Sequence, residues 1–227
     1  MYALQLAFEI FQKRDVYLEK VSEDSYPKAI IKGQIIFIFL AAFIYGVIMG
    51  SYNGVAQAFS SGIKLIALIL LTLLICFPSF YVVQLLLGSK IKLQQLIIIL
   101  LGSFVMLTTI LVAFAPITLF FQLSNSPYSF LQLLHVFVFV FAGAWSMRTV
   151  AEILKIACEK KNIYPKIGLI IFRVWIFILA FVGIQLSWNL RPFIGAKDLA
   201  FEIFRDSTQT NIYATLFGAL GRLLQGH

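Results

Sequence analysis

The stretch IGLIIFRVWIFILAFVGIQLSW (167–188), followed at once by NLRPFIG (189–195), decides how this chain is organised. About 20 consecutive apolar residues cross the hydrocarbon core of a bilayer as a helix, which predicts a membrane span over 167–188. Trp188 at the end of this stretch fits an interfacial ring, and Arg191 and Pro192 after it fit a basic anchor and a helix stop. Residues 167–188 are therefore predicted to cross a membrane, and an interfacial turn is predicted directly after them.

Four more apolar stretches precede this one. They predict spans over 33–50, 63–87, 96–121 and 130–156. The whole chain is 61% hydrophobic and 12% charged, whereas soluble domains are about a quarter charged. The expected fold is an all-α, polytopic membrane domain over 33–188 with five transmembrane helices.

The regions outside the spans are short and amphipathic. Segment 1–32 is expected to carry a surface helix whose apolar stripe includes Leu4, Phe8 and Phe11, and 189–227 is expected to form an interfacial tail. Residues 55–62 read as a separate short interfacial piece, and Lys64 is expected to snorkel from the start of a span to the headgroups. Gly46, Gly50 and Gly54 fall four residues apart on one helical face, which predicts that another helix packs closely there.

Basic residues set the expected orientation. Lysine and arginine gather in the N-terminal segment and in the second and fourth connections, whereas the first and third connections carry none apart from Lys64. Positive residues stay on the cytoplasmic side, so the N-terminus is predicted inside and the C-terminus outside. The net charge of +8 then indicates orientation and contact with anionic lipid headgroups, and not nucleic-acid binding.

Ionisable residues inside spans are the first candidates for function. Arg148 and Glu152 are helical neighbours, and Arg173 lies at similar depth on the next span. We interpret the three either as an anion or lipid-headgroup site or as a structural ion pair. The residues after the last span are candidate contacts for lipids or a partner: Trp188, Asn189, Arg191 and Phe193.

Signatures of catalysis are missing from the sequence. His135 is expected to be a hydrogen-bonded span residue. No carboxylate or second histidine lies at a spacing from it that would predict a metal site. No phosphate-binding glycine loop or nucleophile motif occurs, so no cofactor or metal is expected and the protein is predicted not to be an enzyme.

Four stretches are similar to recurring text in a known group of proteins. They are GVAQAFSSGIKL (54–65), LLTLLICFPSFYV (70–82), LVAFAPITLFFQLS (111–124) and QLSWNLRPFIGAKDLAFEIFR (185–205). The chain resembles the Yip-type five-span membrane proteins, and most of all their uncharacterised bacterial members. The resemblance implies five closely spaced spans, a cytoplasmic N-terminus and a non-enzymatic role, and its bacterial members imply location in a bacterial inner membrane.

These observations lead to a functional hypothesis. We expect a scaffold or accessory subunit that binds lipids and other membrane protein subunits through its spans. A channel or transporter component and a lipid-binding or membrane-shaping protein are the alternatives.

Overall fold

The computed structural model describes residues 29–86, 92–160, 165–195, 201–204 and 212–224. Within these ranges all regular secondary structure is α-helical, which confirms the predicted all-α class. The helices are α3 (Ala29–Gly50), α4 (Val55–Leu86), α5 (Leu93–Leu123), α6 (Tyr128–Lys160), α7 (Pro165–Asn189) and α8 (Ile212–Leu224). The surface helix predicted within 1–32 falls almost entirely outside the described residues.

Four helices, α3 to α6, are long and apolar enough to cross a membrane. The chain is therefore an integral membrane protein by its helix lengths and composition. At 1.5 Å per residue the 33 residues of α6 reach about 50 Å, well beyond a hydrocarbon core of about 30 Å. Large apolar side chains cover the outside of the bundle, among them Leu74, Phe137 and Phe177.

The prediction of a separate interfacial piece over 55–62 is wrong. These residues form the first two turns of α4, which starts directly after the turn at 51–54. Gly62 does not interrupt the helix, since it lies against the ring of Phe43 in α3 and its missing side chain makes room for that ring. Pro78 and Pro116 lie inside α4 and α5.

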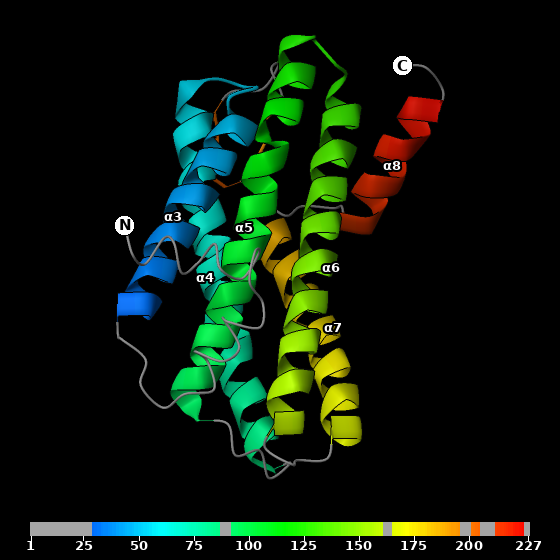
Figure 1. The fold of residues 1–227 in the computed structure, drawn as a ribbon. Helices are drawn as coiled ribbons and strands as arrows, with labels where there is room; N and C mark the ends of the chain where they lie inside the picture. Colours follow the sequence, from blue (N-terminus) through cyan, green and yellow to red (C-terminus); the bar gives the residue numbers. More distant parts are fainter. Residues whose placement is uncertain (1–28, 87–91, 161–164, 196–200, 205–211, 225–227) are drawn as a thin grey trace.

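The helices form a bundle in which chain neighbours are mostly antiparallel (Figure 1). Helix α3 packs on α4 and α5, α5 packs on α6, and α7 packs chiefly on α4. The α4–α7 contact is antiparallel. Trp175 of α7 donates to the carbonyl of Cys76 in α4 at 3.0 Å, whereas Gly183, later in α7, faces Thr72, which is earlier in α4. We call the end of the bundle with the turns 51–54 and 124–127 the hairpin end.

The C-terminal helix α8 does not lie across the ends of the other helices. It runs lengthwise beside the first half of α6, with its C-terminal end toward the hairpin end (Figure 1). Arg222 donates from Nε to the hydroxyl of Ser129 at 3.1 Å, and Ala219 is completely buried. The tail helix is thus packed on the protein itself, and its expected interfacial placement stays a prediction.

Candidate functional site

A hydrogen-bonded group of polar side chains lies on one face of α4. Gln57, Ser61 and Lys64 are spaced four and three residues apart, so they share one face of the helix. All three are buried, although they belong to a helix apolar enough to span a membrane. We call these three residues the α4 polar face. Sequence reasoning missed it because the expected break at 55–62 separated Gln57 from Lys64.

The α4 polar face binds the backbone that follows α7. The carbonyl of Pro192 accepts hydrogen bonds from Gln57 Nε2 at 2.8 Å and from Lys64 Nζ at 2.9 Å. The carbonyl of Phe193 accepts from the Ser61 hydroxyl and from Gln57 Nε2 at 3.2 Å. Two of the regions that carried the family resemblance, 54–65 and 185–205, therefore meet in space.

These hydrogen bonds satisfy backbone carbonyls that the end of α7 leaves without helical partners. The helix stops at Asn189, and the non-helical residues after it have carbonyl groups without helical partners. An unsatisfied carbonyl in an apolar surrounding costs several kcal/mol, about as much as many proteins gain from a core side chain. Gly195 completes the junction with φ +69°, and Asn53 lies so close that an added Cβ would sit 2.7 Å from Nδ2.

We expected Lys64 to snorkel outward to the headgroups, but it does not. Only 5% of the residue is exposed, and its ammonium group turns inward to Pro192, with the ring of Phe204 5.3 Å away. The carbonyl dipole and the ring face both attract a cation, so they offset part of the cost of burying the charge. The lysine thus serves as an internal donor instead of an interfacial anchor.

The three predicted packing glycines are placed differently. Gly46 and Gly50 lie against α4: a Cβ on Gly46 would be 2.6 Å from the Ser61 carbonyl oxygen, and one on Gly50 would be 2.5 Å from that of Gln57. Gly54 instead lies in the turn with φ +140°, and an added Cβ would meet nothing within 4 Å. Its role is the turn conformation and not helix packing.

A second buried polar contact joins α3 to α6. The hydroxyl of Tyr45 and Nδ1 of His135 are 2.9 Å apart, and both residues are almost wholly buried. The ring of Phe139 packs edge-on against Tyr45. His135 therefore has a hydrogen-bond partner within the bundle, and its Nε2 has none among the described residues.

A small cavity opens at the hairpin end. It measures about 230 Å³, below the 300–1,000 Å³ that is usual for small-molecule sites. Its lining is formed by Ser51, Tyr52, Leu119, Gln122, Leu123 and Asn125. Gln122 is already bonded to Ser51 at 3.1 Å and to the Met49 carbonyl at 3.4 Å, so its amide ties α5 to α3.

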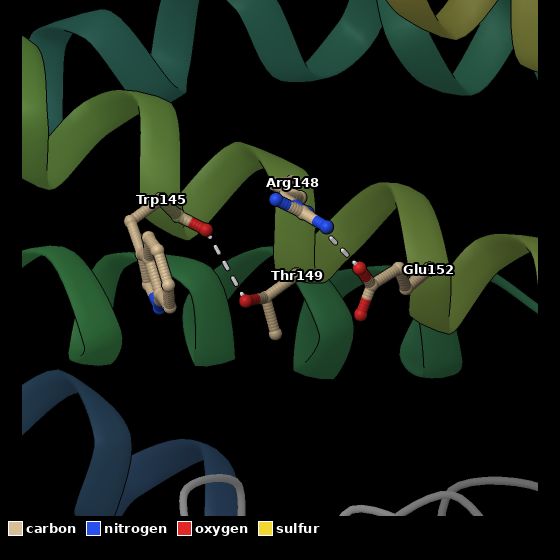
Figure 2. A network of polar contacts seen from close by, with 4 residues as sticks. All are labelled: Trp145, Arg148, Thr149 and Glu152. Atoms are coloured by element: carbon tan, nitrogen blue, oxygen red, sulfur yellow. Dashed lines mark hydrogen bonds and ion pairs between the residues drawn. The ribbon is translucent and has the colours of Figure 1, made fainter.

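Of the predicted ion group, the structure joins Arg148 and Glu152. Figure 2 shows the two side chains pointing toward each other on α6, with Nε and Oε1 3.3 Å apart. Their side chains are 74% and 38% exposed. Arg173 is exposed on α7, and the described residues give it no bond to Glu152. Among the described residues, Arg173 therefore does not join the ion pair of Arg148 and Glu152.

The candidate contacts after the last span are partly used within the chain. The guanidinium carbon of Arg191 lies 3.7 Å from the centre of the Trp188 ring, a stacked cation–π contact. Phe193 is half-buried and gives its carbonyl to the α4 polar face, whereas Asn189 is exposed. The segment is thus anchored to the bundle through its backbone, and its polar tips remain at the surface.

Known proteins offer no direct guide to this site. Neither the protein-family models, nor the curated proteins, nor the solved structures contain a match to the chain. The described residues also hold no group of three or more histidine, cysteine or acidic side chains that would suit a metal ion. The chemistry of the site therefore has to be read from its own contacts.

Proposed function

We propose that this protein is a non-enzymatic scaffold or accessory subunit of a larger membrane protein complex. The observation that carries the proposal is the α4 polar face, whose donors are spent on the carbonyls of Pro192 and Phe193. A polar face used in this way stiffens the bundle and fixes the position of the segment after α7. A rigid bundle with a broad apolar exterior suits binding to neighbouring membrane proteins.

The alternatives have less support. A channel or transporter component needs polar groups that face a path, whereas Gln34, Tyr45 and Gln122 each bond to another helix of the bundle. A lipid-binding or membrane-shaping role draws on the exposed Arg148 at the end of an apolar stretch. The resemblance to Yip-type proteins is compatible with the scaffold role and stays a prediction.

The proposed topology has five crossings. Helix α7 is the fifth, and its apolar part Arg173–Asn189 is continued by the non-helical residues up to Gly195. Among these residues, Pro192 and Phe193 have their carbonyls satisfied by the α4 polar face. We propose that the N-terminus is cytoplasmic and the C-terminus outside, in a bacterial inner membrane. Labelling of single introduced cysteines tests this: Asn125→Cys and Asn189→Cys should react with an impermeant reagent from outside, and Lys92→Cys should not.

Native mass spectrometry of the protein, gently extracted from its own membrane, tests the function. The proposal predicts a defined larger complex in which this chain has a fixed ratio to other subunits. A lone chain or a homo-oligomer that carries only lipid would overturn the scaffold role and favour lipid handling. Stabilisation by a specific solute, measured as a shift in Tm, would instead favour transport.

A further inference from the structure

An aromatic ridge runs along the outer face of α6. The rings of Phe137, Phe141 and Trp145 stack in sequence with centroids 6.2 Å apart at each step, and each residue is 41% exposed or more. Phe114 of α5 supports the middle ring edge-on at 5.7 Å. Because the rings recur every four residues, they form a continuous apolar surface along the helix axis.

The ridge ends in the ion pair of Arg148 and Glu152. Arg148 follows Trp145 by three residues on the same face, and Glu152 lies one turn further (Figure 2). The carboxylate contacts the guanidinium through Nε alone, and the two terminal nitrogens have no partner among the described residues. A guanidinium fixed at one edge presents its other donors as a fork, the geometry that phosphate oxygens accept best.

Helix lengths place this fork at headgroup depth. From Tyr128, where the apolar part of α6 begins, 20 residues lead to Arg148, or about 30 Å. That distance equals the hydrocarbon thickness, so the guanidinium reaches the headgroups of the leaflet opposite the hairpin end. From Phe137 to Arg148 the ridge is about 16 Å long, close to one leaflet's share of the hydrocarbon core.

We propose that the ridge and Arg148 form a binding site for one phospholipid. Its phosphate lies on the terminal nitrogens of Arg148, and one acyl chain lies along Phe137, Phe141 and Trp145. Because Glu152 balances the charge of Arg148, the site recognises the phosphate group itself, which anionic and zwitterionic phospholipids share. This inference does not depend on the scaffold role, since a bundle with or without partner subunits can hold the lipid.

Native mass spectrometry with added lipid tests the site on the purified full chain. Phosphatidylglycerol and phosphatidylethanolamine are the probes, diacylglycerol is the phosphate-free control, and inorganic phosphate is the control without acyl chains. The wild type should retain one phospholipid that the Arg148→Gln variant binds about tenfold more weakly, because a charge-assisted hydrogen bond is lost. Diacylglycerol should bind both proteins equally, and inorganic phosphate should not displace the lipid.

Two further variants keep the test decisive. Arg148→Lys retains the charge but loses the fork, so it should bind the phospholipid more weakly than the wild type even where Arg148→Gln does not fold. Arg173→Gln is the matched control, because it removes an exposed arginine that has no paired carboxylate in the described structure, and it should keep the lipid.

Four outcomes would overturn the assignment. The first is equal phospholipid retention by Arg148→Gln and the wild type, and the second is an equal loss in Arg173→Gln. The third is a protein subunit that leaves with the Arg148→Gln substitution while the lipids remain, which would make the ridge a contact for a partner helix. Displacement by inorganic phosphate would reassign the fork to a soluble anion.

Discussion

Two basic residues inside apolar helices, Lys64 and Arg148, differ in both burial and hydrogen-bond partner. Lys64 lies near the hairpin end, 5% exposed and bonded to a backbone carbonyl, with no carboxylate beside it in the described structure. Arg148 lies toward the other end, with a 74% exposed side chain and a carboxylate partner one turn away. The comparison teaches that a charge in a span is structural where it meets unpaired backbone and available for ligands where it reaches the surface.

Reversing the two charges should separate these roles most strongly. Lys64→Glu places a buried carboxylate against the Pro192 carbonyl, so we expect a loss of about 3–5 kcal/mol in unfolding free energy, or no folded protein. Arg148→Glu creates only an exposed like-charge pair with Glu152, which costs about 0.5 kcal/mol. Thermal unfolding in detergent, with yield by size-exclusion chromatography, measures both. Equal losses would mean that burial does not distinguish the two sites.

The close approach of α3 and α4 supports the Lys64 side of the comparison. Gly46→Val would push a side chain into the Ser61 carbonyl and the Gly62 backbone, so we expect about 3 kcal/mol of destabilisation. Gly143→Ala in α6 is the control, since its Cβ would meet nothing within 4 Å and alanine favours helix. Urea unfolding followed by circular dichroism compares them. A stable Gly46→Val protein would contradict the contact.

Ser61 of the α4 polar face tests the same buried junction, with a smaller expected loss of stability. Ser61→Ala leaves the Phe193 carbonyl with Gln57 alone, and we expect a loss of about 1–2 kcal/mol. Ser187→Ala removes an exposed hydroxyl that bonds only within its own helix, to Ile184, so the expected change is near zero. The difference in Tm between these variants reports the value of the junction. If both shift Tm equally, the junction contributes nothing specific.

The smallest expected effect concerns the exposed pair. Glu152→Gln removes the carboxylate that holds Arg148, but pairs this exposed contribute about 0–1 kcal/mol, so the unfolding free energy should fall by less than about 1 kcal/mol. Unfolding at low and high salt measures it, and the small loss should shrink as salt screens the pair. A loss of several kcal/mol would place Arg148 and Glu152 with the structural residues and against the surface role.

Much of the architecture follows from composition and periodicity. The all-α class and four membrane-length helices were predictable because a long apolar run can satisfy its backbone in lipid only as a helix or in a closed barrel. The pairing of Arg148 with Glu152 was predictable because residues four apart on a helix are neighbours. Both depend on contacts between residues close in sequence.

The α4 polar face was only half visible. Its spacing in QAFSSGIK (57–64) is helical, and an unbroken helix through Gly62 would have revealed three polar residues on one face. The expected boundary between 55–62 and the following span separates Gln57 from Lys64, whereas Gly62 lies within α4 against the ring of Phe43. The partner of His135 was not predictable either, since Tyr45 lies 90 residues away in the chain.

The sequence alone determined that this chain is a helical membrane protein, because the hydropathy and length of each apolar run are properties of consecutive residues. Tertiary structure decided which polar residues are consumed inside the bundle and which remain outside. Lys64 turns inward because α7 ends beside it and leaves the Pro192 carbonyl without a helical partner, while α6 carries Arg148 to the surface. Such pairing depends on which helix ends meet in space, and a one-dimensional pattern does not encode that.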